Sequence, residues 1–412
     1  MPSPDEDAIV VDSFLPARRS LRVAVVTETY PPEINGVSAT IARVVDGLRA
    51  RGHELQVVRP RQDAADAGGG DERLTHALMR GLPIPRYPQL KMGLPSKRAL
   101  IRLWTTRRPD VVHIVTEGPL GWSALQAATH LKLPVVSDFR TNFHAYSRHY
   151  GIAWLRSPIM AYLRRFHNRT ASTMVPTEGL RSELAASGFE RLRVVSRGVD
   201  TQLFDPTRRR EPLRAQWGAD PQTMVALCVG RLAPEKNLGT LLSAFNAMCA
   251  DAPRTRLVLV GDGPARERLM QQCPQAVFAG TRRGEELAGY YASADVFLFP
   301  SVTETFGNVV PEAMASGLAV VGYDYAAAGQ LIVHGENGLL AGFDDAEAFC
   351  AVARRLAGNL PRARALGAQA RTTAGRLDWA RIVEAVETEY TAAMFGAESR
   401  LSPRWRPAVP AA

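Results

Sequence analysis

The stretch ADVFLFPSVTETFGNVVPEAMASGLAVVG, residues 294–322, decides the fold. Residues 296–299 and 319–322 are short apolar runs, typical of strands that are buried on both faces of a sheet. The residues between them contain a loop followed by a predicted helix. A strand, a helix and a second strand in this order form a βαβ unit, whose two strands are parallel and whose crossover is right-handed.

The same alternation extends in both directions from this stretch. We predict further strands, each a short apolar run, at residues 21–27, 55–58, 111–115, 135–137, 173–176, 194–195, 224–229, 256–260 and 277–279. Helices are predicted between them, among others at about residues 37–48, 122–131 and 178–187. This alternation predicts an α/β protein built from doubly wound parallel sheets.

The apolar periodicity lapses over residues 197–217, which we interpret as a linker between two Rossmann-like domains facing across a cleft. Ligands of such sheets bind at the carboxyl ends of the strands. We expect a flexible loop at residues 63–71 and an irregular excursion at residues 80–96, which is rich in proline. The predicted division is an N-terminal tail, two domains and a flexible tail, at residues 1–20, 21–200, 201–395 and 396–412.

The composition indicates a soluble globular protein, because 46% of the 412 residues are hydrophobic and 22% are charged. No uncharged apolar run reaches the roughly 18 residues of a transmembrane helix. The acidic start, MPSPDEDAIVVD, lacks the positive charge of a secretory signal, so we expect a cytoplasmic protein. The four cysteines are too widely spaced for a metal knuckle or a redox pair, which fits a reducing compartment.

The net charge of +9 comes entirely from the first half of the chain. Residues 1–200 contain 28 Lys and Arg against 19 Asp and Glu, whereas residues 201–412 contain 22 of each kind. The first half is therefore expected to face an anionic partner: a nucleic acid, an anionic membrane surface or an acidic substrate.

Two segments carry residues suited to binding phosphate groups. Gly36 lies in a loop that opens onto a helix, and backbone N–H groups at a helix start bind phosphate. Arg231 follows one predicted strand and Lys236 precedes the next helix, so the two cations could clamp a diphosphate. Either feature alone also fits an ordinary turn or a solvated surface pair.

Glu304 and Glu312 lie on either side of the sequence Phe-Gly-Asn. Glu304 falls in the loop after a strand and Glu312 in the following helix, so both carboxylates can point into one cleft and accept hydrogen bonds from sugar hydroxyls. Gly307, Asn308 and Val309 would offer backbone N–H groups to phosphate. A Glu pair at this spacing is weak evidence alone, because helix starts favour Glu.

The ordered segments NGVS, GVD, GRLAPEKN, GDGP, ADVFLFPS and ETFGNVVPEAMASG resemble the family-4 retaining glycosyltransferases of the GT-B fold, over residues 21–395. This resemblance implies a nucleotide-sugar donor, GDP-mannose or a UDP-sugar, held mainly by the second domain. It implies an acceptor held mainly by the first domain. The likeness is greatest to bacterial enzymes that glycosylate lipids, such as mannosyltransferases and sulfoquinovosyl-diacylglycerol synthases.

The resemblance also implies a role for each candidate residue. Arg231 and Lys236 would neutralise the donor diphosphate, and Gly36 would contact it from the opposite wall. Glu312 would bind the ribose and Glu304 the transferred sugar. The remaining positions would contact sugar and phosphate through the backbone, or lie beside the base, and they are Gly307, Asn308, Val309 and Thr281.

The sequence departs from the family where many members have a histidine after the strand preceding the acceptor site. Arg140 occupies that position here, and His144 follows four residues later. Either side chain could meet the transferred sugar, and a lone histidine is more often structural. Both stay catalytic candidates together with Glu304.

Other functions fit the sequence less well. A dehydrogenase would need Gly-x-Gly-x-x-Gly, whereas Gly261 and Gly263 are followed by Arg266. No nucleic-acid recognition motif is present, so no nucleic-acid partner is expected. A phosphorylase would need one of only four lysines for pyridoxal phosphate. A nucleotide-sugar epimerase, or a transferase with a soluble oligosaccharide or polysaccharide acceptor, remains open.

No Asp-x-Asp follows a predicted strand, so neither a metal nor another cofactor is expected. Two basic segments of the first half, residues 91–108 and 148–169, mix cations with aromatic and aliphatic residues. This mixture suits a helix lying in a membrane interface, so we expect docking on the inner face of the cell membrane. The alternative is that the apolar residues pack on the sheet and the arginines are only solvated.

Overall fold

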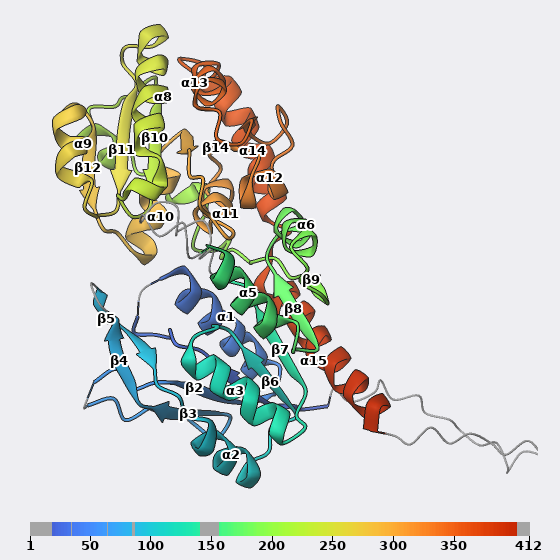
Figure 1. The fold of residues 1–412 in the computed structure, drawn as a ribbon. Coiled ribbons are helices and arrows are strands. Elements are labelled where there is room, and N and C mark those ends of the chain that lie inside the picture. Colours follow the sequence, from blue (N-terminus) through green and yellow to red (C-terminus); the bar gives the residue numbers. More distant parts are fainter. Residues whose placement is uncertain (1–18, 34, 64, 85–86, 141–155, 402–412) are drawn as a thin grey trace, which may run out of the picture.

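The computed structural model describes residues 19–33, 35–63, 65–84, 87–140 and 156–401. The chain forms two lobes, each built around a parallel β-sheet with helices on both faces (Figure 1). Apart from one antiparallel hairpin, every strand pair described is parallel, as the alternation of strand and helix predicts.

The first lobe contains a seven-stranded sheet with the order β3-β2-β1-β6-β7-β8-β9. Its strands are β1 (Arg22–Val26), β2 (Glu54–Pro60), β3 (Leu74–Met79), β6 (Val111–Ile114), β7 (Val135–Asp138), β8 (Ser172–Val175) and β9 (Leu192–Val194). Its helices are α1 (Gly36–Ala50), α2 (Lys97–Thr106), α3 (Pro119–His130), α5 (Arg156–His167) and α6 (Glu178–Ala186). The strand order reverses between β1 and β6.

The second lobe contains a six-stranded sheet with the order β12-β11-β10-β13-β14-β15. Its strands are β10 (Val225–Val229), β11 (Arg256–Val260), β12 (Val277–Gly280), β13 (Val296–Phe299), β14 (Ala319–Tyr323) and β15 (Leu339–Ala341). Its helices are η2 (Pro206–Arg208), α7 (Glu211–Gln216), η3 (Pro234–Lys236), α8 (Leu238–Asp251), α9 (Arg266–Gln272), α10 (Gly284–Ala292), α11 (Val309–Ala315), α12 (Ala326–Leu331), α13 (Ala346–Arg354) and α14 (Leu360–Ala374). Here the order reverses between β10 and β13.

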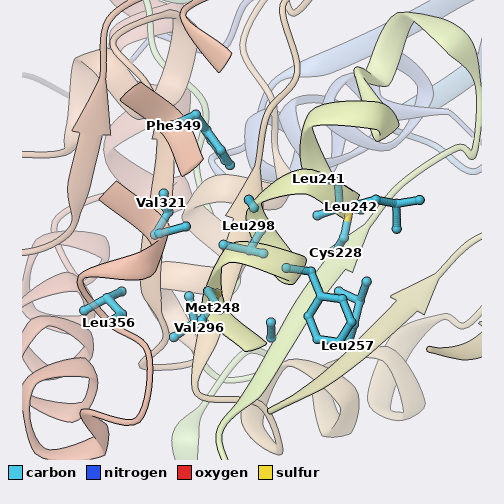
Figure 2. Close-up of a cluster of buried hydrophobic side chains, with 14 of the residues drawn as sticks. Cys228, Leu241, Leu242, Met248, Leu257, Val296, Leu298, Val321, Phe349 and Leu356 are labelled. Atoms are coloured by element: carbon cyan, nitrogen blue, oxygen red, sulfur yellow. The ribbon is translucent and has the colours of Figure 1, made fainter. Parts of the chain in front are cut away.

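Each sheet buries both faces, which explains why its strands are uninterrupted apolar runs. Within β10, Ala226 and Cys228 face one core cluster while Val225 and Leu227 face the other. Figure 2 shows the first of these clusters, in which side chains of β10, α8, β13 and β14 meet. The two clusters hold the loops at the carboxyl edge of this sheet on a rigid base.

The last helix, α15 (Trp379–Leu401), returns to the first lobe. Val383, Val386, Tyr390 and Ala393 belong to the same core cluster as residues of α1, β1 and β6. Figure 1 shows this helix, in red, running along the blue and green lobe. The sequence-based division placed residues 379–395 in the second domain and began a flexible tail at residue 396, whereas the structure packs α15 on the first sheet and continues it to Leu401.

The irregular excursion predicted for residues 80–96 contains regular structure. β4 (Gly81–Ile84) and β5 (Tyr87–Gly93) form an antiparallel hairpin. The prediction was wrong here because prolines do not exclude a strand at an edge, where an N–H group needs no partner. β3 and β15 were also missed, because each is only partly apolar or very short. Across the described ranges, no helix is both long and apolar enough to cross a membrane.

Candidate active site

The predicted donor-side residues gather at the carboxyl ends of β10, β12 and β13. Arg231 follows β10, Thr281 follows β12, and Glu304 lies in the loop after β13. The strand order of this sheet reverses between β10 and β13. In open parallel sheets ligands bind at such a switch point, outside the carboxyl ends of the strands.

Lys236 and Glu304 form an ion pair, although 68 residues separate them in the chain. Ser301 Oγ donates a second hydrogen bond to the same carboxylate oxygen of Glu304, at 2.8 Å. Burial raises the pKa of Glu304, but the Lys236 ammonium and the Ser301 hydroxyl outweigh it and hold that pKa below its usual value. Glu304 is therefore an ionised acceptor for hydroxyl groups at neutral pH.

Arg231 lies beside this pair and forms an ion pair with the buried carboxylate of Glu235. The Glu235 carbonyl accepts a hydrogen bond from Thr303 Oγ1, at 3.1 Å, which ties this turn to the loop after β13. The turn and the loop thus bring two cations to one edge of the sheet. Two cations at this edge are suited to a diphosphate.

Glu312 lies in the first turn of α11 and accepts a hydrogen bond from Tyr291 OH at 2.9 Å. Burial raises the pKa of Glu312 to about 7, although the Tyr291 hydroxyl opposes this rise. Tyr291 is fully buried in α10, so it fixes one carboxyl oxygen. The other oxygen can accept from a ligand. Sequence reasoning missed Tyr291, because its spacing from Glu312 has no meaning before the helices are packed.

Asn308, which follows Gly307, contacts the first lobe. Gly307 has a φ of +94°, in the region that favours glycine, which lets the chain turn sharply before α11. Asn308 Nδ2 lies 3.5 Å from Thr40 Oγ1 of α1, and 3.5 Å from the point where a Cβ on Gly36 would stand. The start of α1 therefore faces the start of α11.

Arg140 follows β7 and ends a buried chain of polar side chains. Its Nε donates to Asp138 Oδ2 at 2.5 Å, and His113 Nε2 lies 2.9 Å from the same oxygen. His113 Nδ1 lies 2.8 Å from Tyr390 OH, which comes from α15. Burial raises the pKa of Asp138, but the charges of Arg140 and His113 outweigh it and bring that pKa to about 2. This series of hydrogen-bonded residues reaches the second lobe, because the Arg140 carbonyl accepts a hydrogen bond from Thr305 Oγ1 at 2.9 Å.

A second buried arginine, Arg197, lies between the lobes and was not predicted. Its Nη1 donates to Asn308 Oδ1 at 3.1 Å, and its guanidinium carbon lies 5.5 Å from the centre of the Phe306 ring. The signal was available, since Arg197 follows a strand of the first sheet at its carboxyl end. The lapse in apolar periodicity predicts only the beginning of a linker at this position.

The structure brings most of the predicted residues together. Lys236 contacts Glu304, Asn308 reaches the start of α1 beside Gly36, and Val309 begins α11. Thr281 is exposed at the end of β12. His144 lies outside the described residues. Within the described ranges no cluster of three or more His, Cys, Asp or Glu is suited to a metal ion, and the expectation that no metal is needed remains a prediction.

Two family models match the chain. One, described as "Glycosyltransferase Family 4", matches residues 34–203, and the other, described as "Glycosyl transferases group 1", matches residues 223–359. The chain is 38% identical over 330 residues to a GDP-mannose-dependent alpha-mannosyltransferase of Mycobacterium tuberculosis, which covers 78% of this chain and 83% of that protein.

Two further relatives carry other names. The sulfoquinovosyl transferase of Arabidopsis thaliana is 30% identical, over 95% of this chain and 78% of its own. An alpha-monoglucosyldiacylglycerol synthase of Acholeplasma laidlawii is 26% identical, over 73% of this chain and 80% of its own.

Solved structures support the fold. The sucrose-phosphate synthase of Thermosynechococcus elongatus superposes with a TM-score of 0.77 at 20% identity, over 92% of this chain and all of that one. The HepE protein of Anabaena, solved with UDP and glucose, superposes with a TM-score of 0.70 at 19% identity, over 90% and 99% of the two chains.

Proposed function

The chain belongs to glycosyltransferase family 4, and we propose that it transfers mannose from GDP-mannose, with retention of configuration, to a hydroxyl group of a lipid or glycolipid. The observation that carries this proposal is the grouping of Arg231, Lys236, Glu304 and Glu312 at the switch point of the second sheet. The name of the mycobacterial relative supports the choice of donor.

In the proposed complex the donor lies along the carboxyl edge of the second sheet. Arg231 and Lys236 neutralise its diphosphate, and Glu312 accepts hydrogen bonds from the ribose hydroxyls. Glu304 accepts from hydroxyls of the mannose, because its ionised carboxylate lies beside Lys236. As the bond to the sugar breaks, charge develops on the leaving phosphate, and the two cations stabilise that charge.

Retention of configuration at the sugar follows from the group that we assign to take the proton of the acceptor hydroxyl. Asp138 is the carboxylate next to Arg140, and with a pKa of about 2 and two partners it accepts a proton poorly at neutral pH. We therefore assign the acceptor's proton to the leaving phosphate oxygen, so that the acceptor attacks the face from which the phosphate departs. No metal ion is assigned a step in this scheme.

A thermal-shift screen against GDP-mannose, UDP-glucose and UDP-galactose tests the donor. A ligand that binds only the native state at about 100 times its Kd stabilises the protein by about 2.7 kcal/mol, so the donor should raise Tm measurably. GDP-mannose should give the largest shift, and a larger shift with a UDP-sugar would contradict the assignment. Incubation with donor alone should leave it unchanged, since conversion to another nucleotide sugar would indicate an epimerase.

The lipid acceptor is supported by the name of the Acholeplasma relative and by exposed cations on the first lobe. On α2 the cations Lys97, Arg98 and Arg102 are exposed, whereas Leu100 and Trp104 are fully buried in the core. The apolar side chains of α2 therefore do not form an insertion surface, which corrects that part of the expectation. Residues 148–155 of the other basic segment lie outside the described residues.

We propose that docking on an anionic membrane is electrostatic, at about 1 kcal/mol for each cation near the surface. Vesicle sedimentation with anionic and neutral lipids, at low and high salt, tests this. Binding should occur on anionic vesicles at low salt, should weaken with salt, and should weaken in an Arg98→Glu, Arg102→Glu variant. No binding to anionic vesicles at low salt would contradict the proposal and favour a soluble acceptor.

A further inference from the structure

Arg197 is a buried cation that forms no ion pair with any residue described. Only 7% of the surface of Arg197 is accessible to solvent. Among the residues described, its guanidinium donates one hydrogen bond, to the neutral amide oxygen of Asn308. Burial and the neighbouring charge of Arg140 lower the pKa of Arg197 to about 9, although the charges of Asp138 and Glu304 oppose this decrease. Burying an unpaired charge is costly, so a charge kept in this state calls for an anionic partner.

The nearby carboxylates already have cationic partners. Asp138 is paired with Arg140, and Glu304 is paired with Lys236. Residues 141–155, which follow Arg140 in the chain, contain no Asp or Glu, so that segment cannot supply a carboxylate. The counter-charge of Arg197 is therefore expected from a ligand.

The charges of Asp138 and Glu304 act on Arg197, so a ligand would approach it from the carboxyl ends of β7 and β13. A cavity of about 20 Å³ beside Arg197 is lined by Thr40, Asp138, Ile382 and Val386, among others. That volume holds about one water molecule and no phosphate or carboxylate group. Gly36, at the start of α1, lies close to Asn308, and the positive dipole end of this helix also favours an anion nearby.

We infer that Arg197 binds an oxyanion of a bound substrate beside Asn308, as a cation supplied by the first lobe. This inference rests on the proposed function and deepens it. The oxyanion has two possible sources, the donor diphosphate or an acidic group on a sugar. The charge of Glu304, which is paired with Lys236, acts on Arg197, so an oxyanion beside Arg197 would lie near charged groups of both lobes.

Calorimetric titration of the purified full chain separates the two sources. The first arm compares GDP with guanosine, and the second compares glucuronate with glucose at saturating GDP. Arg197→Gln removes the charge but keeps a donor for Asn308, and Arg197→Lys restores the charge. Arg371→Gln is the matched control, because Arg371 bonds Asp205 and backbone carbonyls within the second lobe.

A lost charged hydrogen bond should weaken oxyanion binding at least about tenfold. Arg197→Gln should weaken GDP binding and spare guanosine if the diphosphate is the source, or weaken glucuronate binding and spare GDP if an acidic sugar is the source. Arg197→Lys should recover part of the lost affinity, and Arg371→Gln should change neither arm. If Arg197→Gln does not fold, the partial loss in Arg197→Lys gives the same comparison.

The inference is overturned if folded Arg197 variants bind GDP and glucuronate as the wild type does. Arg197 would then be a contact between the lobes only, visible as a lower Tm. Failure of the proposed function has a different signature. In that case the wild-type protein itself would not bind GDP in the first arm.

Discussion

The raised pKa of Glu312 predicts that nucleotide affinity depends on pH near neutrality. If Glu312 accepts hydrogen bonds from the ribose, only its ionised form binds well, since a protonated carboxyl lacks one acceptor oxygen. With a pKa of about 7, about a tenth of the carboxyl is ionised at pH 6 and about nine-tenths at pH 8. GDP affinity should therefore rise by about tenfold across this range.

Calorimetric titration with GDP between pH 5.5 and 8.5 measures this dependence. The phosphate of GDP also titrates near pH 6, so the wild-type profile must be compared with that of Glu312→Gln, which has the same phosphate contribution. Glu304→Gln is the second comparison and should keep the wild-type profile, because Glu304 is assigned to the sugar. Parallel profiles for the wild type and Glu312→Gln would refute the ribose assignment.

The same group predicts how stability depends on pH. Below pH 4.5, the usual value, both the folded and unfolded states carry the proton. Between 4.5 and about 7 the folded state retains the proton that the unfolded state loses, so stability falls as pH rises. The loss amounts to about 3 kcal/mol at 1.36 kcal/mol per pH unit. Glu312→Gln should lack this loss in urea unfolding, and an equal decline in both proteins would contradict the burial of the carboxyl.

Further variants test the remaining assignments. Arg231→Ala or Lys236→Ala should lower kcat/KM by about two to three decades while circular dichroism stays unchanged; near-normal turnover in a folded double variant would remove the clamp from the mechanism. His144→Ala should cost at least about 100-fold in rate if His144 serves the reaction centre, whereas a loss below about threefold would leave Arg140 as the better candidate. Tyr390→Phe should lower kcat by about threefold to tenfold with GDP affinity unchanged, because it removes the hydrogen bond to His113, which holds Asp138 and through it Arg140; an unchanged kcat would make Tyr390 a packing residue only.

Apolar periodicity along the chain determined the two sheets. Strands buried on both faces must be continuous apolar runs, so β1, β10 and β13 could be predicted from the sequence alone. The ends of these strands also fix where the following loops begin. Arg231 and Glu304 could therefore be assigned to one edge of the sheet from the sequence. β4 and β5 escaped prediction because an exposed hairpin has no such requirement.

Only the tertiary structure decided which charges meet. Lys236 pairs with Glu304, Tyr291 holds Glu312, and Arg197 is left without a carboxylate among the residues described. These outcomes depend on distances of a few ångströms between loops that are far apart in sequence, and a Coulomb interaction depends on that distance and on burial.

The place of α15 was likewise settled only by packing. Val383, Val386 and Tyr390 recur at a helical spacing that suits a helix on either sheet. Nothing in that spacing specifies which sheet receives the helix, because burial of apolar surface is not directional. The hydrogen bond between Tyr390 and His113 is directional, and it exists only in the arrangement that the folded chain adopts.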